Sequence, residues 1–240
     1  WCDVVREAAD CRPDLVLMPE TITSWTLPRD RMGHARPIPG PETDAFCAVA
    51  AECDTMVAFS MNELDDDLIY NTGLIIEKDG TIAGKYRKVH LAITEGWDGT
   101  TPGNEMPVFD TSIGALTMTI CKDSSIHESA RVPAVKGAEA MLLSIMGDHR
   151  AVHWGTAPGS FSPDRWKVIM RARAIDNHLW MIVARNNQEG SCIISPSGDI
   201  VAWSCGSNRV IWADCDFGER LRPSRGSSFA DSTWAERRPQ

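Results

Sequence analysis

Three side chains could act together on a substrate. Two of them follow segments that are predicted to be strands, and the third lies within such a segment. The alternating apolar segment from Ile113 to Ile120 leads directly to Cys121, and the apolar segment from Asp14 to Met18 leads to Glu20. Lys88 belongs to a third strand-like stretch. A thiolate is a nucleophile, a carboxylate can carry its proton, and an ammonium group can stabilise an oxyanion. The sequence therefore predicts covalent catalysis by a cysteine.

Each of these residues also has a plainer interpretation. Cys121 could be a buried structural thiol, which is how we interpret the other seven cysteines. Glu20 could be a solvated strand end, and Lys88 could be a surface charge, as we expect of Lys85. The catalytic interpretation requires that the surrounding elements bring the three side chains together.

The composition narrows the class of protein but not its chemistry. The chain has 240 residues, of which 43% are hydrophobic and 24% charged, and these values are ordinary for a globular protein with a substantial core. The formal net charge of -9 argues against nucleic acid as the main partner, because phosphate binding requires clustered Lys and Arg. No apolar run is long enough to span a membrane. The eight cysteines are scattered without a C-x-x-C pair, which favours a reduced, cytoplasmic setting.

Helical and strand patterns alternate along the chain, which favours a layered α/β domain. We predict helices over residues 1–12, 42–53, 125–137 and 163–178. We predict strands over residues 14–18, 56–61, 70–76, 81–91, 113–120, 140–145, 180–185, 191–195, 200–203 and 208–214. We expect one domain over residues 1–240, with a tail from about residue 215 to residue 240, where Arg and Ser are frequent and periodicity is lost.

Short motifs support several of these boundaries. Asp79-Gly80 is typical of a hairpin turn. Ser125-x-x-Glu128 has the form of a capping box and would begin the helix after Cys121. Pro133 lies inside that helix, where it should produce a kink. Residues 94–106 are predicted to form a loop.

A set of longer motifs spans nearly the whole chain in a fixed order. They are Leu-Met-Pro-Glu20, Gly-Lys-Tyr-Arg-Lys88-Val-His-Leu, Thr-Pro-Gly-Asn104, Ile-Cys121-Lys-Asp123, Arg171-Ala-Arg-Ala-Ile-Asp-Asn177 and Ser-Pro-Ser-Gly-Asp199. Together they resemble the motifs of the nitrilase superfamily, the carbon-nitrogen hydrolases. The resemblance implies a four-layer αββα sandwich that assembles into a homodimer or a larger homo-oligomer. It also implies a catalytic triad of Glu20, Lys88 and Cys121, with a further family glutamate at Glu95.

The resemblance assigns a role to each of these residues. Cys121 would attack an amide carbon and form a thioester, while Glu20 would carry the proton to the leaving ammonia or amine and then activate water. Lys88 would stabilise the oxyanion, with the backbone N–H of Lys122 as a second donor. Glu95 would position Lys88 or the substrate.

The sequence departs from the family pattern in three places. The family has a strand and most of a helix ahead of the segment that begins here at Trp1, so we expect the N-terminal strand to be missing from the sandwich. Lys122 stands where relatives often have an aromatic residue. Ile126-His127-Glu128 stands where they tend to have Phe-Pro-Glu or Tyr-Pro-Glu. The last two differences bear on the substrate.

Small linear amides or N-carbamoyl compounds are the expected substrates. Asp123 resembles the amidase and carbamoylase branches, because true nitrilases tend to have Trp-Glu after the cysteine. Hydrolysis of a nitrile is the runner-up, and a catalytically silent subunit or binding protein on this fold is the third hypothesis. Trp25, Trp97 and Trp154 lie in predicted loops and could bind substrate together with Lys122, although ordinary packing explains the tryptophans equally well.

No cofactor and no metal are expected. His149 and His153 have the i, i+4 spacing of metal ligands on a helix. However, Arg150 stands where the H-E-x-x-H motif needs its glutamate, and no third ligand is evident in the sequence.

Overall fold

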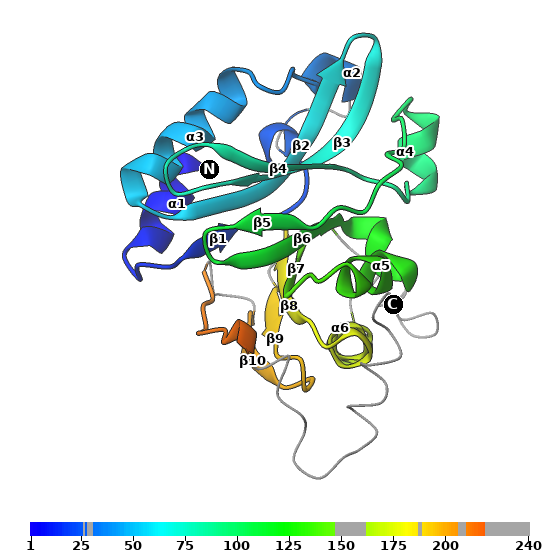
Figure 1. Cartoon of the computed structure of the whole chain (residues 1–240). Helices are drawn as coiled ribbons and strands as arrows, with labels where there is room; N and C mark the ends of the chain where they lie inside the picture. The colour runs from blue at the N-terminus through cyan, green and yellow to red at the C-terminus, as the bar shows by residue number, and fades with distance from the viewer. Residues whose placement is uncertain (26, 28–30, 147–161, 187–188, 206–209, 219–240) are drawn as a thin grey trace.

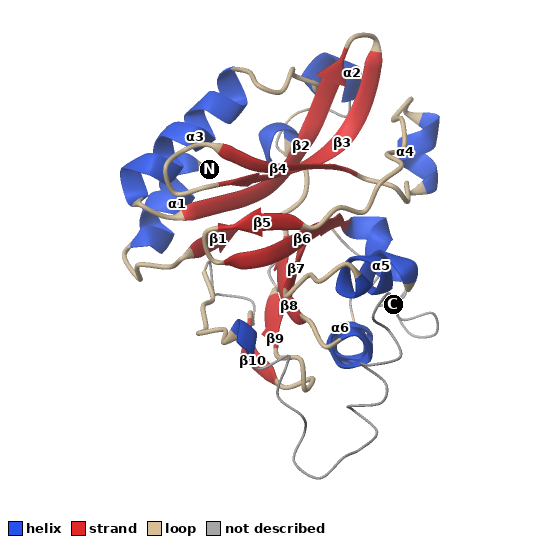
Figure 2. Cartoon of the chain, in the orientation of Figure 1, coloured by secondary structure: helices blue, strands red, loops and turns tan. Residues whose placement is uncertain are grey.

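Two β-sheets lie face to face in the computed structural model of the chain, and helices cover the outer face of each sheet (Figures 1 and 2). The structure describes residues 1–25, 27, 31–146, 162–186, 189–205 and 210–218. The four layers are those of an αββα sandwich, so the predicted fold class is confirmed.

The elements of the described residues alternate as the sequence predicts. The helices are α1 (Cys2–Ala9), α2 (Arg31–His34), α3 (Pro41–Cys53), α4 (Ile93–Trp97), α5 (Glu128–Val135) and α6 (Pro163–Asn177), with the 3-10 turns η1 (Ile22–Ser24) and η2 (Cys121–Ser125). The strands are β1 (Leu15–Leu17), β2 (Met56–Asp65), β3 (Leu68–Ile76), β4 (Ile82–Arg87), β5 (Phe109–Thr111), β6 (Gly114–Ile120), β7 (Ala140–Ile145), β8 (Trp180–Arg185), β9 (Cys192–Ile194) and β10 (Ile200–Trp203).

Sheet A, formed by β1 to β4 in that order, positions two of the predicted catalytic residues. Strand β1 runs parallel to β2, whereas β2, β3 and β4 are antiparallel. Successive side chains along β3 and β4 therefore point in turn to the helices and to sheet B. Glu20 follows β1 and Lys88 follows β4, so both lie next to strand ends of this sheet.

Sheet B has the strand order β10-β9-β8-β7-β6-β5 and positions the thiol. Strands β6, β7 and β8 are parallel to one another. Every residue of β7 is buried, as expected for a parallel strand that is covered on both faces. Because parallel strands end at the same edge of a sheet, Cys121 after β6 and Met146 after β7 lie at one edge.

Three apolar clusters fill the three interfaces between the layers. Phe46 of α3 packs on Phe59 of β2, in the cluster between sheet A and the helices α1 and α3. Met118 and Leu142 belong to the cluster between the sheets. Trp166 of α6 is fully buried against the other face of sheet B. Polar side chains placed between the sheets are consequently kept away from bulk water.

A glycine in β3 leaves room for a side chain of sheet B. A Cβ atom added to Gly73 would lie 2.6 Å from the sulfur of Met118 in β6. A side chain at this position would force the side chain of Met118 to move. Gly73 thus permits the close contact that encloses the inner face of β3.

Most predicted elements are confirmed, with boundaries that differ by a few residues. Strands β7, β8 and β10 coincide with the predicted segments. Gly80 has a positive φ of 86°, as its place in the predicted hairpin turn suggests. Strand β2 continues beyond the predicted end to Asp65, because β3 pairs with it along its whole length. Residues 94–106 are not wholly a loop, since they include most of α4.

Two predictions are wrong. Ser125 ends η2 and does not begin a helix; α5 begins at Glu128 with His127 as its N-cap and no side-chain capping bond. Residues 210–214, which are the described part of the predicted strand 208–214, form no strand. Their apolar side chains pack against the core instead. Val210 contacts the cluster between sheet A and the helices α1 and α3, and Ala213 contacts the cluster between the two sheets.

The predicted tail is described only at its beginning. Phe217 packs against the cluster between the sheets, and residues 219–240 lie outside the described residues. His149 and His153 also lie outside them. All eight cysteines are described, and each is a free thiol. Within the described ranges, no helix combines the length and the apolar character that crossing a membrane requires.

Candidate active site

Lys88 is fixed by main-chain hydrogen bonds on both sides. Its N–H donates to the carbonyl of Asn71 in β3 at 2.9 Å, and its carbonyl accepts from the N–H of Gly103 at 2.8 Å. Only glycine fits at position 103, because a Cβ there would collide with the carbonyl of Arg87. The Thr-Pro-Gly-Asn104 motif therefore has a local purpose, which is to hold the segment that contains Lys88.

The ammonium group of Lys88 lies between two buried carboxylates. Lys88 Nζ donates to Glu20 Oε1 at 3.0 Å and to Glu95 Oε2 at 2.7 Å. The side chains of Lys88, Glu20 and Glu95 are 1%, 6% and 3% exposed. Lysine has three N–H donors, so one remains for another acceptor. The sequence prediction that Glu95 lies beside Lys88 agrees with this geometry.

Glu20 is held by elements of both sheets. The chain leaves β1 through Met18, whose N–H donates to the carbonyl of Ala58 at 2.8 Å and whose carbonyl accepts from Ser144 Oγ at 2.7 Å. The second carboxylate oxygen, Oε2, accepts from the N–H of Met146 at 2.9 Å. The carboxylate is thus fixed at the edge where the parallel strands of sheet B end.

Glu95 is held by α4 and by β3. Its Oε2 accepts from the N–H of Ala92 at 2.7 Å, and its Oε1 accepts from Asn71 Nδ2 at 2.9 Å. Asn71 Nδ2 also donates to Glu20 Oε1 at 2.9 Å. One neutral amide therefore connects both carboxylates that face Lys88.

Cys121 occupies a sharp turn between β6 and η2. Its φ of 43° lies in the left-handed region, which non-glycine residues seldom adopt and which is often found at functional sites. The half-buried side chain contacts the cluster between the sheets and the cluster beneath α5 and α6. Lys122 is the second residue of η2, and N–H groups in a first helical turn have no acceptor within the helix. These N–H groups could bind an oxyanion.

The charges of the cluster stabilise one another. Burial lowers the pKa of Lys88, but the negative charges of Glu20 and Glu95 and the hydrogen bond to Glu95 more than compensate, so this pKa is raised above its usual value. Burial raises the pKa of Glu95, but Lys88 and the hydrogen bonds from Asn71 and Ala92 bring it below its usual value. We conclude that Lys88 is a cation and Glu95 an anion at neutral pH.

Asp123 connects the cysteine turn to the lysine segment. Its carboxylate accepts from Tyr86 Oη at 2.6 Å, from the N–H of Ile120 at 2.9 Å and from the N–H of His90 at 3.0 Å. Burial and the negative charge of Asp123 raise the pKa of Tyr86, so the phenol keeps its proton and remains a donor. Residues on both sides of Lys88 are in this way bound to the turn that begins at Cys121.

The structure brings only some of the predicted site residues together. Lys88 is in direct contact with Glu20 and with Glu95, and Asp123 connects the turn of Cys121 to the segment of Lys88. Their catalytic roles remain predictions. Asn71 was not predicted, although a polar residue on a strand face shared with Ile69 and Ile75 was a usable signal.

The predicted substrate-binding residues are dispersed. Trp25 packs against Trp1, with ring centroids 5.8 Å apart. Trp97 ends α4 and is 81% exposed, and Trp154 lies outside the described residues. Lys122 alone adjoins Cys121. The substrate-binding assignments therefore remain predictions, with support from position only for Lys122.

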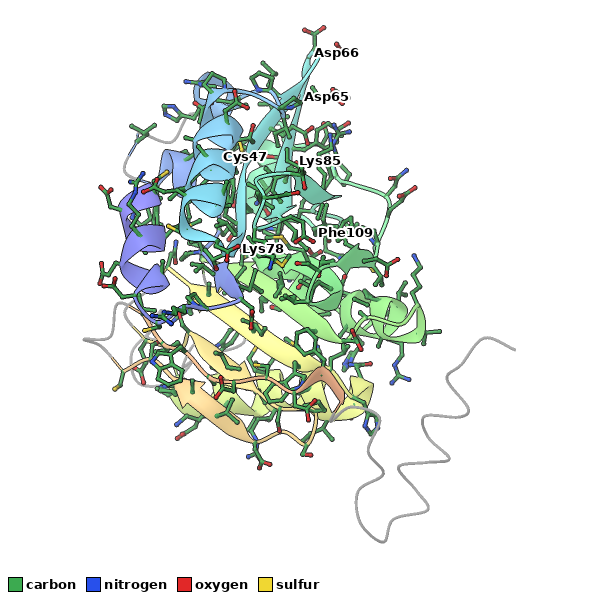
Figure 3. The ribbon with its side chains drawn as sticks, turned by 60° about the vertical axis from the view of Figure 1, so that its left-hand side comes forward. Cys47, Asp65, Asp66, Lys78, Lys85 and Phe109 are labelled. Atoms are coloured by element: carbon green, nitrogen blue, oxygen red, sulfur yellow. The ribbon has the colours of Figure 1, made fainter. Side chains whose placement is uncertain are left out.

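A second cluster of charge lies on the opposite face of β2, β3 and β4. Glu63 Oε1 accepts from Lys85 Nζ and from Arg87 Nη2, each at 2.8 Å, and Glu63 Oε2 accepts from Thr72 Oγ1 at 2.6 Å. Arg87 also donates to Asp65, which lies near the tip of the β2–β3 hairpin (Figure 3). We call this group of residues the outer cluster, and we call Glu20, Lys88, Glu95 and Asn71 the inner cluster.

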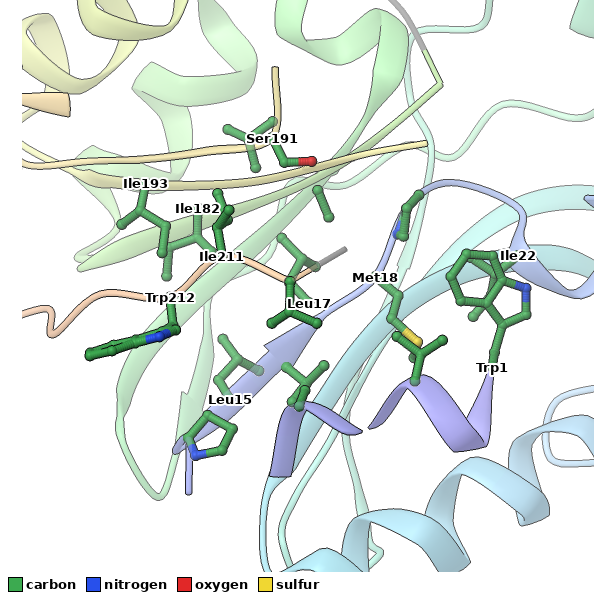
Figure 4. Close-up of a pocket in the computed structure, with 18 of the residues that line it drawn as sticks. Trp1, Leu15, Leu17, Met18, Ile22, Ile182, Ser191, Ile193, Ile211 and Trp212 are labelled. Atoms are coloured by element: carbon green, nitrogen blue, oxygen red, sulfur yellow. The ribbon is translucent and has the colours of Figure 1, made fainter. Parts of the chain in front are cut away.

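A large hollow in the described part of the chain is not the candidate active site. It has a volume of about 1190 Å³ and is lined by α1, β1, β8, β9 and residues 210–217 (Figure 4). Leu15, Ile182 and Trp212 contribute to its mainly apolar wall. Its lining includes none of the inner cluster and not Cys121. Size alone would therefore give a misleading location for the chemistry.

Comparison with known proteins gives the same picture over most of the chain. A model of the carbon-nitrogen hydrolase family matches residues 1–220. The omega-amidase NIT2-B of Xenopus laevis is 28% identical over 237 residues, which cover 90% of this chain and 81% of that protein. The omega-amidase NIT2 of Homo sapiens is 27% identical with the same coverage.

Solved structures share the fold. A carbon-nitrogen hydrolase from Helicobacter pylori G27 has a TM-score of 0.75 at 22% identity and covers 92% of this chain and 84% of its own. A mutant of the amidase from Nesterenkonia sp. AN1, with acrylamide added at its active-site cysteine, has a TM-score of 0.68 at 18% identity. That match covers 85% of this chain and 81% of the amidase. Both likenesses support the four-layer architecture.

Proposed function

The chain belongs to the carbon-nitrogen hydrolase family, and from this premise we propose that it hydrolyses the C–N bond of a small linear amide with Cys121 as the nucleophile. The observation that carries the proposal is the position of Lys88. A buried ammonium group lies between two carboxylates, in a cluster connected through Asp123 to a cysteine in a strained turn. The amidase names of the relatives support an amide as the substrate.

The first half of the reaction forms a thioester. Glu20 takes the thiol proton while Cys121 Sγ attacks the amide carbon, and the carbonyl oxygen becomes an oxyanion. The C–N bond then breaks, and Glu20 gives the proton to the departing nitrogen. Ammonia or an amine leaves, and the acyl group stays on the sulfur.

The second half releases the acid. Glu20 takes a proton from water as the water oxygen attacks the thioester carbon. The C–S bond breaks, and the thiolate of Cys121 regains the proton that Glu20 holds. Carboxylic acid and free enzyme result, so the protons balance over the cycle.

Lys88 stabilises the oxyanion in both halves. Two of its N–H groups are used by Glu20 and Glu95, and within the described part of the chain the third has no acceptor and can serve the substrate oxygen. Its charge acts in a site from which water is largely excluded, where it needs no reorganisation during the reaction. The backbone N–H of Lys122 supplies the second donor.

The test is ammonia release from a panel of linear amides, N-carbamoyl compounds and nitriles. We expect turnover of amides by the wild type and none by Cys121→Ala or Cys121→Ser, since Glu20 is a weak base for a hydroxyl group. Cys11→Ala, at an exposed thiol, is the matched control and should keep full activity. Equal turnover by wild type and Cys121→Ala would disprove the covalent mechanism. Hydrolysis of nitriles alone would contradict the amide proposal.

Alkylation separates an enzyme from a silent subunit on the same fold. Iodoacetamide followed by peptide mapping should find one fast-reacting thiol, at Cys121. Burial raises the pKa of the thiols of Cys47 and Cys192, so these should react slowly. If Cys121 reacts no faster than the exposed Cys11, the site is not active as a nucleophile.

A further inference from the structure

Asn71 bridges the two glutamates of the inner cluster with a single amide group. Asn71 Nδ2 donates to Glu20 Oε1 and to Glu95 Oε1, each at 2.9 Å. The residue is fully buried, and its carbonyl accepts from the N–H of Lys88, which makes it the cross-strand neighbour of the lysine. Asn71 and Lys88 therefore supply donors to the same two carboxylates from adjacent strands.

The orientation of the amide has a consequence for its other end. Turning the amide over would place Oδ1 against two carboxylate oxygens, which would repel it, so the observed orientation is the favourable one. In this orientation Oδ1 has no hydrogen-bond partner among the described residues. A buried carbonyl without a partner is unfavourable for folding. The unpaired carbonyl thus offsets part of the stability that the two hydrogen bonds to the carboxylates contribute.

We propose that Asn71 is a positioning residue for the catalytic carboxylates, a role that rests on the function proposed above. Its two amide hydrogens bind Glu20 and Glu95 and hold them apart on either side of Lys88. The third N–H of Lys88 then remains available for the substrate oxygen.

Electrostatics explains why a neutral donor is needed here. Two carboxylates in a dry site repel each other, and one of them tends to take up a proton. A protonated Glu20 could not accept the proton of Cys121. A second cation would also balance the two carboxylates, but it would repel the ammonium group of Lys88 and compete with it for their oxygens. An amide donates to both carboxylates without adding charge.

The strand offers a matched control at the next residue. Thr72 points to the opposite face of β3 and donates its hydroxyl to Glu63 Oε2 at 2.6 Å. Like Asn71, Thr72 is fully buried and donates to a buried carboxylate. Thr72→Val removes one such bond in the outer cluster and should leave catalysis unchanged.

The experiment compares Asn71→Ala, Asn71→Asp and Thr72→Val by the pH dependence of kcat/KM for ammonia release. In Asn71→Ala we expect kcat to fall about 100-fold. We expect the acid limb of its profile to move up by about one pH unit, because the carboxylates lose a charge-assisted hydrogen bond. Asn71→Asp should shift the limb further, since it adds a third carboxylate. Thr72→Val should shift neither kcat nor the limb.

The order of the two Asn71 variants distinguishes positioning from packing. A packing role predicts that the isosteric Asp is mild and that Ala, which leaves a cavity, is severe. The positioning role predicts the reverse order and a moved acid limb. An unmoved limb in Asn71→Ala, in a wild type that does hydrolyse amides, would overturn the inference. If Asn71→Asp does not fold, the profile of Asn71→Ala decides alone.

A second measurement keeps this inference separate from the proposed function. If the wild type releases no ammonia from any substrate, the proposed function fails, and the pH dependence of Cys121 alkylation then tests Asn71. A shift of the acid limb of the alkylation curve to higher pH in Asn71→Ala but not in Thr72→Val supports the positioning role, and identical curves overturn it.

Discussion

Strands β3 and β4 have a cluster of buried charge on each face, and the two clusters differ in how their charges are balanced. In the outer cluster Glu63 faces two cations, Lys85 and Arg87, and Arg87 has a further partner in Asp65. In the inner cluster the single cation Lys88 binds two carboxylates.

Exposure separates the clusters further. The side chains of Lys85 and Arg87 are 40% and 25% exposed, whereas that of Lys88 is 1% exposed. Water and salt can therefore screen the cations of the outer cluster but not the cation of the inner one. The comparison suggests that the outer cluster is a structural group of ion pairs, whose charges are balanced where solvent reaches them. The inner cluster, as a catalytic group, keeps a hydrogen-bond donor for the substrate in a site that is shielded from water.

The largest expected effect is that of Lys88→Gln. It removes the cation that two buried carboxylates share and the donor that the oxyanion needs. We expect kcat/KM for ammonia release to fall about 1,000-fold and the free energy of unfolding to fall by about 3–5 kcal/mol. Lys85→Gln is the matched control in the outer cluster, and its activity should remain that of the wild type. Similar losses in both variants would erase the distinction between the clusters.

Glu95→Gln should have the next largest effect. The amide keeps the shape of the side chain but loses the ion pair with Lys88 at 2.7 Å. We expect kcat to fall about 100-fold with a smaller change in KM, because the loss concerns the orientation of Lys88 in the transition state. Steady-state kinetics on the best amide of the panel gives both constants. An unchanged kcat would remove Glu95 from the catalytic group.

Glu63→Gln should reverse that pattern, with an effect on stability rather than on catalysis. It leaves Lys85 and Arg87 without the carboxylate that holds them on β4. We expect the free energy of unfolding in urea to fall by about 2–3 kcal/mol, since both cations can still reach water. Ammonia release per folded molecule should not change. A loss of kcat comparable to that of Glu95→Gln would show that the outer cluster supports the site.

The sequence predicts the inner cluster better than it predicts the surroundings of that cluster. Glu20 and Lys88 follow from motifs at or near strand ends, and strand ends of a layered α/β protein converge, whereas Glu95 follows from the resemblance to the family alone. The faces of β4 also follow from its period of two, which places Lys85 and Lys88 on opposite faces. Lys85 was expected to be a surface charge, and its partial exposure agrees with that.

Other features could not be predicted because they depend on contacts between distant segments. Asn71 acquires its role only when folding brings β3 near Glu20, which follows β1, and near Glu95 of α4, and a single strand does not reveal this. Trp25 was expected near the substrate because it lies in a predicted loop. A loop has no regular period along the sequence, so the direction of its side chains cannot be predicted. Residues 210–214 alternate like a strand, but their apolar side chains pack against two separate clusters.

The smallest predicted effect concerns acid stability, and both clusters should share it. The pKa values of Glu95 and Glu63 both lie below the ordinary value of 4.5, because cations and hydrogen bonds outweigh burial. A lowered pKa in the folded state adds stability above the ordinary pKa, and this stability is lost as the pH falls through the lower folded value. Each residue should therefore steepen the loss of stability below about pH 4.5, by at most about 1.4 kcal/mol per pH unit.

Urea unfolding between pH 3 and pH 7 tests this for Glu95→Gln and Glu63→Gln. Each variant should start less stable at pH 7 and lose less stability than the wild type as the pH falls. Because the linkage is the same in both clusters, the acid slopes should change alike, while only Glu95→Gln loses activity. A slope that stays at the wild-type value in Glu95→Gln would mean that this carboxyl group is not held ionised by Lys88. The inner cluster would then have a different charge state from the one on which its catalytic role depends.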